Sequence, residues 1–508
     1  MSIPYKNLGD LIDRNRPLDE VAIIDLRVAA APRILTHLDV DRLANGVARK
    51  LVDLGLEPGV HVAIAAANRA EYLIAYFGIM RAGLVAVPVN IKASESTLDH
   101  ILADSSARLA FVDSERRARL QGKLPLIDFD DEGPEGFTAW VQPTDFDTID
   151  PGPAGIAQML YTSGSTGLPK GVRLSHAGQG WALSAVLRLE PRGEKQSRYL
   201  LAQPLFHMNG LFMAKRAFAV NALLVILPSF DVATYVDALE NFRITTLTAV
   251  PTMFARIVRD PETLRGRDFS SLQRVMLGSA PMTRALLQRI QDAFPNVRVT
   301  HGYGTTEAGP AVFGPHPQGI PMPPLALGYV LPDVEVRLLT SEGDDTNEGV
   351  LWIRNPAVMA GYHNLPDKTA QVVRDGWYCT GDVMRHDENG FFYFVGRADD
   401  MFVVSGENVY PGEVEKTLES HHAVRQACVV PIPDEERGHI PVAFIVSQSG
   451  QALSEQDIKQ HALQYGPAYQ HPRRVYFLDT LPWAGTNKVD RNALRDLALS
   501  LERQGVAA

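Results

Sequence analysis

The sequence predicts an α/β protein with more than one domain, and three observations support this fold class. The chain has 508 residues, which is too many for one ordinary hydrophobic core. Its hydrophobic content of 45% and charged content of 21% are typical of a soluble globular protein. Apolar runs of strand length alternate with stretches of helical periodicity near the N-terminus and again after Val424. This alternation favours parallel strands connected by helices.

The first clear alternation begins at residue 38. Apolar residues recur at helical spacing across residues 38–57, and glycines mark the end of that predicted helix. An apolar run over 60–67 predicts a strand, 68–82 a second helix and 84–89 a second strand. We therefore expect two parallel strands with a helix between them.

Residues 126–153 interrupt this pattern. They are acidic and rich in glycine and proline, and the run 128–134 has the composition of turns. We expect an exposed excursion there, which leads into a buried strand over the apolar run 156–161.

The stretch after that strand carries the strongest chemical signal. It reads Thr162-Ser163-Gly164-Ser165-Thr166-Gly167-Leu168-Pro169-Lys170-Gly171. Glycines let backbone N–H groups approach an anion closely, hydroxyls add donors, and Lys170 adds a mobile positive charge. These features predict a loop that binds a nucleoside triphosphate. It is not the P-loop of nucleoside triphosphatases, because the lysine of that motif is followed by serine or threonine and Lys170 is followed by Gly171.

The loop resembles the signature of the adenylate-forming enzymes, which include acyl-CoA synthetases, the adenylation domains of peptide synthetases and the firefly luciferases. Every fixed position of their Thr-Ser-Gly-Thr/Ser-Thr-Gly-x-Pro-Lys-Gly pattern matches. The chain is most similar to their fatty-acyl, coumarate and malonyl CoA ligases. The resemblance implies a large N-terminal multi-sheet α/β domain over residues 1–396, which binds ATP and the acyl group. It also implies a small, mobile C-terminal α/β domain over residues 397–508, which carries a catalytic lysine.

Three further segments resemble the acyl and adenine sites of this superfamily. His207 lies in an apolar segment where relatives place a histidine or aromatic residue beside the substrate carboxylate, in a catalytic or pocket-lining role. Val250 follows an apolar run over 244–248 and resembles a segment that lines the acyl pocket. A third strand-like run is followed by small residues against which a flat base could lie, at the place where relatives bind adenine; these residues are Gly278, Ser279, Ala280 and Pro281.

A second strong motif supplies an aromatic ring, two hydroxyls and a carboxylate within six residues. It reads Gly302-Tyr303-Gly304-Thr305-Thr306-Glu307. Mg²⁺ prefers oxygen ligands and often keeps water beside one or two carboxylates, which suits Glu307. The resemblance implies that Thr306 contacts the α-phosphate as a catalytic group and that Glu307 holds the metal. It also implies that Asp382 accepts hydrogen bonds from the ribose hydroxyls and that Arg397 completes the ribose and phosphate contacts.

The C-terminal part resembles the mobile domain of the CoA-ligating members. Asp399 aligns with their interdomain hinge. The residues Ser405, Gly406 and Glu407 resemble the loop that lines the tunnel for the pantetheine arm of CoA. Lys488 aligns with the lysine that bridges the substrate carboxylate and the α-phosphate. Asn487 replaces the usual glycine before it, and asparagine tolerates the left-handed backbone better than most residues.

These residues predict an ATP-dependent carboxylic acid–CoA ligase that forms acyl-AMP and then acyl-CoA, using ATP, Mg²⁺ and coenzyme A. A formal net charge of −10 argues against a nucleic-acid binder. The N-terminus lacks the apolar segment of a signal peptide, no apolar run is long enough to span a bilayer, and two distant cysteines match no metal spacing. We expect a cytoplasmic enzyme. Its oligomeric state is open, with a homodimer as one option.

Other functions stay open at this stage. An adenylation enzyme that loads a carrier protein is the main alternative, although no carrier-like segment follows residue 508, which favours free CoA. A luciferase-like oxygenase and a catalytically inactive binding protein are weaker alternatives. Intact Lys488, Glu307 and Asp382 argue against the inactive protein.

Two features bear on the acid. Gly304 aligns with a tryptophan that closes the acyl pocket in acetate-activating relatives, so we expect medium or longer fatty acids, or aromatic acids, over acetate. Lys215 and Arg216 are expected to be solvated on a helix face. Alternatively, they meet the anionic group of a polar substrate, which would be a dicarboxylate such as malonate.

Overall fold

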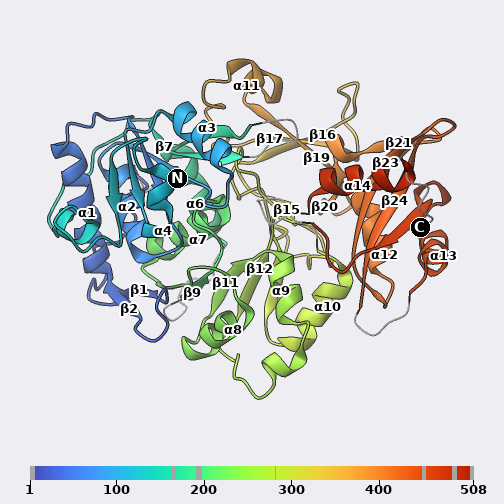
Figure 1. Cartoon of the computed structure of the whole chain (residues 1–508), viewed down its shortest axis with the longest axis horizontal. Helices are drawn as coiled ribbons and strands as arrows, with labels where there is room; N and C mark the ends of the chain where they lie inside the picture. Colours follow the sequence, from blue (N-terminus) through green and yellow to red (C-terminus); the bar gives the residue numbers. More distant parts are fainter. Residues whose placement is uncertain are drawn as a thin grey trace.

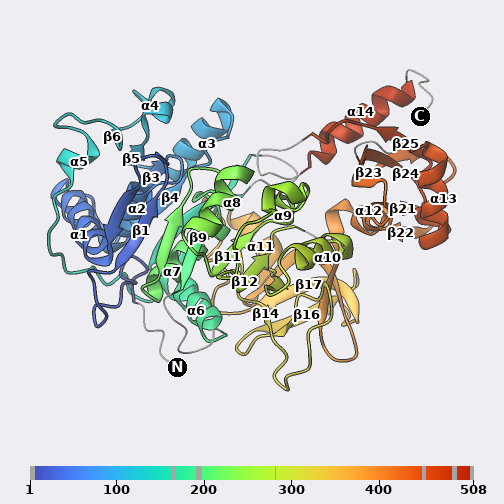
Figure 2. The same ribbon diagram turned by 90° about the horizontal axis from the view of Figure 1, so that it is seen from below.

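The structure is a computed structural model that describes residues 6–162, 168–189, 197–280, 282–448, 453–482 and 489–503 (Figure 1). Two large sheets, each built mainly from parallel strands, form the N-terminal part. A five-stranded antiparallel sheet follows them, and a further sheet with its helices lies at one end of the molecule (Figure 2). Within the described residues, no helix combines the length and the apolar composition needed to cross a membrane.

The first large sheet has six strands in the order β6-β5-β3-β4-β7-β8. All neighbours are parallel except β7 and β8, which pair antiparallel and are joined through residues 163–169. Residues alternate between two apolar clusters along β3, so both faces of this sheet are buried. The strands are β3 (His61–Ala65), β4 (Val85–Pro88), β5 (Leu109–Val112), β6 (Leu126–Asp128), β7 (Ile156–Thr162) and β8 (Lys170–Ser175).

The second large sheet has seven strands in the order β13-β12-β11-β9-β10-β1-β2. Every pair is parallel except β1 with β2. The carboxyl ends of six neighbouring strands therefore meet at one edge of the sheet. The strands are β1 (Val21–Asp25), β2 (Arg33–Thr36), β9 (Arg198–Leu201), β10 (Leu223–Ile226), β11 (Thr246–Ala249), β12 (Arg274–Leu277) and β13 (Arg298–His301).

Helices complete a stack of five layers. The middle layer lies between the two sheets and shares one apolar cluster with both; it contains α1 (His37–Asp53), α2 (Ala70–Arg81), α6 (His176–Leu187) and α7 (Met208–Ala219). The outer face of the seven-stranded sheet is covered by α8 (Val232–Asn241), α9 (Pro251–Ile257) and α10 (Arg284–Ala293). The outer face of the six-stranded sheet packs on α3 (Glu95–Ser105) and α4 (Ser114–Leu120), and the short α5 (Phe137–Trp140) follows β6.

In the middle layer, α2 is not an ordinary amphipathic helix, because it has no solvent-facing side. Every residue of α2 is buried, because sheets cover it on both sides. Thr36 caps α1 through a reciprocal capping box with Asp39, and Ser175 caps α6 by accepting from the backbone N–H of Gly178.

The antiparallel sheet holds the order β16-β17-β19-β18, with β20 paired to β19. It is the last sheet before the chain enters the C-terminal part. Its strands are β16 (Glu335–Leu339), β17 (Glu348–Arg354), β18 (Val373–Arg374), β19 (Trp377–His386) and β20 (Phe392–Arg397); α11 (Pro366–Val372) precedes β18, and a small ribbon pairs β14 (Phe313–Gly314) with β15 (Tyr329–Val330).

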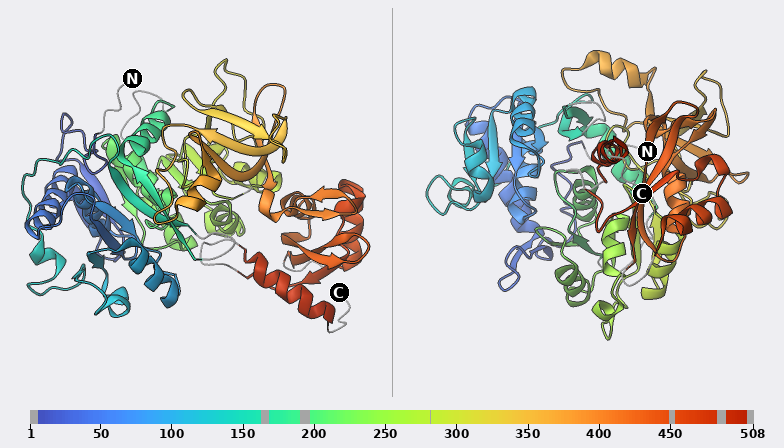
Figure 3. Two further views of the ribbon diagram at one scale, coloured as in Figure 1. Left: turned by 90° about the horizontal axis from the view of Figure 1, so that it is seen from above. Right: turned by 45° about the vertical axis from the view of Figure 1, so that its right-hand side comes forward.

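A single short crossing connects this sheet to the C-terminal sheet. The chain leaves β20 at Arg397, makes one 3₁₀ turn over Ala398–Asp400 and enters β21. The C-terminal sheet forms a separate body with its own apolar clusters (Figure 3). Its elements are β21 (Phe402–Val404), β22 (Glu407–Val409), β23 (Val424–Asp434), β24 (Gly438–Ser447), β25 (Arg474–Phe477), α12 (Pro411–Glu419), α13 (Glu455–Tyr465) and α14 (Arg491–Arg503), with a 3₁₀ turn at Ala468–Gln470. In the N-terminal part, another 3₁₀ turn at Pro261–Leu264 lies between α9 and β12.

The predicted N-terminal alternation is confirmed with small shifts in the element boundaries, and β3 and β4 pair in parallel. The expected exposed excursion over 126–153 is wrong in its first half. β6 pairs with β5, and Phe129 and Phe137 are buried against Phe111. The aromatic residues of this stretch supply core packing that its acidic and glycine-rich composition concealed.

Candidate active site

The largest group of predicted site residues follows the carboxyl ends of strands in the seven-stranded sheet. Val250 follows β11, Gly278 follows β12 and Gly302 follows β13, and these three strands are neighbours. His207 follows β9, the next strand in the same sheet, after a short connection. In open α/β sheets, ligands bind outside the carboxyl ends of the strands. This edge is therefore where a nucleotide and a second substrate could meet.

The backbone is unusually close between the ends of β12 and β13. A Cβ atom on Gly278 would lie 2.9 Å from the carbonyl oxygen of Gly302, so a side chain would force the two segments apart. Ser279 has a left-handed φ of 66°, which is uncommon for a residue other than glycine. Nε2 of His301 lies within hydrogen-bond distance of the carbonyl oxygen of Ala280, at 3.3 Å. With no side chain at Gly278, backbone borders this place, against which a planar base could lie.

A tight turn holds Glu307 in place. The backbone N–H of Ala308 donates to the hydroxyl of Thr305 at 2.9 Å, and Thr305 also bridges to Gly309. The backbone N–H of Met359 donates to the carbonyl of Glu307 at 2.7 Å. Thr306 lies within this turn, directly before Glu307. Backbone contacts thus fix the turn and leave the carboxylate available for other partners.

Tyr362 connects Glu307 to the end of the predicted phosphate loop. Its hydroxyl donates to Glu307 Oε1 at 3.0 Å, and Lys170 Nζ lies 4.7 Å from the centre of its ring. Burial, and then the charge of Glu307, raises the pKa of Tyr362 well above its usual range. The phenol is therefore a stable hydrogen-bond donor at neutral pH. The structure brings Lys170 and Glu307 together around a residue that the sequence analysis missed.

Asp382 is the centre of a second group. It is buried, and Tyr303 donates its hydroxyl to Oδ2 while Arg397 Nη1 donates to Oδ1 at 2.8 Å. Arg397 also donates to the carbonyl of Thr380 at 2.9 Å and lies 3.4 Å from Asp399 Oδ2. Burial opposes the charge of Arg397, but Asp382 outweighs it, so the pKa of the guanidinium is raised.

Tyr378 lies between the two groups. Burial raises its pKa, followed by the nearby charges and hydroxyls of Glu307, Tyr362, Tyr303 and Asp382. Tyr378 lies four residues before Asp382 in the sequence. Neither Tyr362 nor Tyr378 carried a sequence signal of its own, because a single tyrosine among apolar residues is ordinarily a packing residue.

His207 and Val250 occupy equivalent places after the neighbouring strands β9 and β11. His207 is the N-cap residue of α7, and Val250 is the N-cap residue of α9. The His207 ring packs edge-on against Phe206 with 4.6 Å between ring centres. Both residues are partly exposed at the strand ends, which is compatible with the predicted acyl side of the site.

The predicted CoA loop is a β-hairpin turn in the C-terminal sheet. Ser405 and Gly406 connect β21 to β22, with φ angles of 52° and 90°. Two central residues with positive φ are typical of a type I′ turn. Glu407 begins β22. These three residues are exposed and are not part of the group formed by Glu307 and Asp382.

Several predicted residues fall outside the described part of the chain. They are Ser163, Gly164, Ser165, Thr166 and Gly167 of the phosphate loop, Pro281, and Lys488. Thr162 and Lys170, which flank the loop, are paired partners in the antiparallel ladder of β7 and β8. The predicted transition from a strand into this loop is confirmed up to Thr162.

Two expectations need correction. A Cβ atom on Gly304 would lie 2.5 Å from Cα of Pro310 and 2.9 Å from the carbonyl of Gly309, so this glycine is required by backbone packing. It therefore cannot be taken as a simple opening in the acyl pocket. Lys215 and Arg216 are not solvated: they are 0% and 6% exposed.

Metal binding at this site would rest on very few protein ligands. Among the described residues, no group of three or more histidine, cysteine, aspartate or glutamate side chains is arranged to hold a metal ion. Tyr362 donates to one oxygen of Glu307, and a carboxylate can accept at both of its oxygens. A Mg²⁺ ion held by one carboxylate, substrate phosphates and water fits this donor set.

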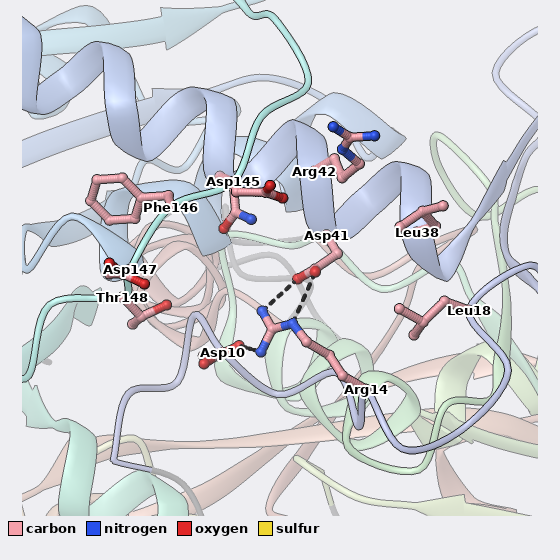
Figure 4. Close-up of a pocket in the computed structure, with 11 residues that line it drawn as sticks. Asp10, Arg14, Leu18, Leu38, Asp41, Arg42, Asp145, Phe146, Asp147 and Thr148 are labelled. Carbon is pink, nitrogen blue, oxygen red and sulfur yellow. Dashed lines mark hydrogen bonds and ion pairs between the residues drawn. The ribbon is translucent and has the colours of Figure 1, made fainter.

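A separate pocket of about 600 Å³ lies on the N-terminal part (Figure 4). Arg14 donates to both carboxylate oxygens of Asp41, and the buried Arg81 pairs with Asp41 as well. These contacts tie the N-terminal segment to α1. The pocket contains none of the predicted site residues; it is lined by Asp10, Arg14, Leu18, Leu38, Asp41, Arg42, Asn45, Asp145, Phe146, Asp147 and Thr148.

The fold and the site together define a nucleotide-binding α/β enzyme with a separate C-terminal domain. The chain belongs to the AMP-binding enzyme family: residues 12–363 match the AMP-binding enzyme domain, and residues 413–488 match the AMP-binding enzyme C-terminal domain.

Known proteins are similar to this chain over nearly its whole length. A fatty acid–acyl-carrier-protein ligase, ScoC, of Streptomyces coeruleorubidus is 34% identical over 91% of this chain and 92% of that protein. A feruloyl-CoA synthase of Amycolatopsis sp. is 33% identical over 91% of this chain and 93% of that protein. The crystal structure of the anthranilate-CoA ligase AuaEII with anthranoyl-AMP covers 99% of both chains, with a TM-score of 0.88 and 28% identity.

Proposed function

We propose that the protein is an ATP-dependent carboxylic acid–CoA ligase that works through an acyl-AMP intermediate. The observation that carries this proposal is the convergence of Lys170, Tyr362 and Glu307 beside Asp382 and Arg397, with Glu307 in the turn that follows β13. Membership of the AMP-binding enzyme family and similarity to CoA ligases support it.

In the first half-reaction, the substrate carboxylate attacks the α-phosphorus of ATP and pyrophosphate leaves. Both reactants are anions, so catalysis depends on positioning and on neutralising charge. Loop residues 162–170 would bind the phosphates, and Thr306 and Lys488 would contact the α-phosphate. Glu307 would hold Mg²⁺, which supplies positive charge to the phosphate oxygens.

The nucleoside would lie between the strand ends and the antiparallel sheet. The backbone of 278–280 and Tyr303 would contact adenine, and Asp382 with Arg397 would bind the ribose. Asp382 already accepts one hydrogen bond at each oxygen. Each carboxylate oxygen can accept a second, so the pair is pre-positioned without being saturated.

In the second half-reaction, the CoA thiol attacks the acyl carbonyl and AMP leaves. We infer that the C-terminal domain, from residue 397 onward, rotates between the two steps about Asp399. The change of sheets across Ala398–Asp400 supports a hinge there, since hinges are short connections that absorb the backbone change. The turn at Ser405-Gly406-Glu407 would then approach the site and line the path of CoA. A cytoplasmic location is part of this proposal, and the oligomeric state stays open, with a homodimer as one option.

A carrier protein is a second candidate acceptor, because one similar protein is named as a fatty acid–acyl-carrier-protein ligase. Both acceptors present the same phosphopantetheine thiol. For the acid itself, the names of similar proteins support aromatic and fatty acids. A dicarboxylic acid is the alternative.

A panel of acids tests this proposal. Pyrophosphate release is measured with short, medium, long, aromatic and dicarboxylic acids, with and without CoA. We expect acid-dependent release, with turnover increased by CoA. A protein that releases no pyrophosphate with any acid would contradict the proposal, and turnover increased only by a carrier protein would select the second acceptor.

A further inference from the structure

A lysine is fully buried in the middle helical layer without a carboxylate beside it. Lys215 on α7 is 0% exposed, and its Nζ donates to Gln179 Oε1 on α6 at 3.2 Å. The centre of the Phe212 ring lies 5.9 Å from Nζ. No carboxylate in the described part of the chain counters its charge. A buried ammonium ordinarily requires a charged partner.

Two further donors lie near this lysine. His176 and Gln179 stand one turn apart on α6, and each is 1% exposed. Nδ1 of His176 accepts from the backbone N–H of Leu8 at 3.0 Å, so the proton of the neutral ring sits on Nε2. Neither His176 Nε2 nor Gln179 Nε2 has a hydrogen-bond partner among the residues that the structure describes.

Burial lowers the pKa values of both basic groups at this place. Burial lowers the pKa of Lys215 to about 7. Burial, and then Lys215, lowers the pKa of His176 to about 4. The group thus holds donors in excess of acceptors, in a place where an unsatisfied polar group is costly. A small anion is the kind of ligand that could accept hydrogen bonds from such donors.

We propose that Lys215, His176 and Gln179 form a buried site for one carboxylate-type anion. The carboxylate is either free in solution or the distal group of an acyl substrate. The second source rests on the proposed function. It is favoured by position: Lys215 lies eight residues, or about 12 Å, along α7 from His207. Helical side chains lean towards the N-terminus of their helix, so Lys215 extends back towards Phe212 and the predicted acyl side.

Three variants isolate the site. Lys215→Met removes the ammonium and keeps the length of the side chain. Gln179→Glu places a carboxylate beside Lys215 and should occupy the site internally. Lys92→Met makes the same lysine-to-methionine substitution at an exposed turn and serves as the matched control.

The first measurement does not depend on the enzymatic activity. Thermal unfolding is followed while sodium formate is titrated at constant ionic strength. A free-anion site predicts a saturable rise in Tm for the wild type and for Lys92→Met. The rise should be absent in Lys215→Met and in Gln179→Glu, and the latter should have the higher Tm without formate.

The second measurement compares kcat/KM for monocarboxylic acids with that for α,ω-dicarboxylic acids of increasing length. A substrate site predicts that one dicarboxylic length is favoured, and that Lys215→Met lowers its ratio to the matched monocarboxylic acid by about tenfold or more. Lys92→Met should leave the ratio unchanged.

The two measurements distinguish failure of the proposed anion site from failure of the proposed function. An effect in the second identifies the distal carboxylate of the substrate as the ligand, and an effect in the first alone identifies a free anion. No effect in either overturns the site and leaves Lys215 as a neutral buried amine. If no acid is activated, the proposed function fails while the formate titration still decides the site.

Discussion

At the scale of single residues, Tyr362 contacts two groups that the chain places far apart in sequence. Its hydroxyl holds one oxygen of Glu307, and its ring lies beneath the ammonium of Lys170. A cation over an aromatic ring is attracted by about 0.5–2 kcal/mol, depending on exposure. Tyr362 thus positions both the proposed metal ligand and the proposed phosphate ligand.

Tyr362→Phe separates these two contacts, because it keeps the ring and removes the hydroxyl. Loss of a hydrogen bond to a charged group is typically worth about 1.5–3 kcal/mol. We expect kcat/KM for adenylation to fall by about tenfold or more, with a higher Mg²⁺ concentration needed for half-maximal rate. Tyr393→Phe is the matched control, because Tyr393 donates in the same way to Asp387. An unchanged Mg²⁺ requirement would show that Tyr362 does not position Glu307.

Lys215 makes a separate prediction about stability and pH. Its ordinary pKa is 10.5, and burial lowers the folded-state pKa to about 7. Between these values the unfolded chain holds a proton that the folded chain lacks, so wild-type stability rises with pH by up to about 1.4 kcal/mol per unit. In anion-free buffer, Lys215→Met should be most stabilised relative to the wild type below pH 7, and the difference should shrink as pH rises. Urea unfolding across this range checks it, and a constant difference would contradict the folded-state pKa.

At the scale of elements, the structure shows which helices and strands could be predicted from the sequence. The strand over 156–161 and the helix over 38–57 were predictable, because each is long, periodic and bounded by turn residues. The core role of 126–153 was not, since its buried aromatic residues are spaced among acidic and glycine residues. Burial of Lys215 was equally hidden, because it depends on α7 lying between two sheets rather than on the pattern of α7 itself.

The hairpin between β21 and β22 offers a test at this scale. Gly406 has a φ of 90°, and a Cβ atom there would meet nothing within 4 Å, so any effect of substitution is conformational. Gly406→Val should destabilise the turn by about 1–2 kcal/mol. We expect slower formation of acyl-CoA from supplied acyl-AMP, with adenylation much less affected. Gly406→Asn is the control, because asparagine tolerates the left-handed region. Equal losses in both half-reactions would argue against a specific role for this turn in CoA binding.

At the scale of the whole molecule, the proposal depends on two domains joined by one short crossing. The chain passes from β20 to β21 through Ala398–Asp400. Asp399→Pro should spare adenylation and slow the thioester step, because proline fixes φ and restricts rotation. Asp399→Ala removes the same carboxylate without that restriction and separates the two effects. Stopped-flow measurement of each half-reaction provides the comparison, and thioester formation that is equally fast in both variants would exclude a hinge at residue 399.

Lys488 tests the role of the C-terminal domain in the adenylation half-reaction. The motif assigns it to the first half-reaction, so Lys488→Ala should lose adenylation by about a hundredfold or more. It should retain most of the thioester formation from supplied acyl-AMP. A similar loss in both half-reactions would contradict alternation of the C-terminal domain.

The central claim is that an acid is activated as acyl-AMP before it meets a thiol. The most direct measurement is exchange of labelled pyrophosphate into ATP, with each acid and without CoA, followed by mass spectrometry of the products after CoA is added. We expect acid-dependent exchange in the absence of CoA, and then one AMP released for each acyl-CoA formed. Release of ADP, or formation of acyl-CoA without any acid-dependent exchange, would contradict it.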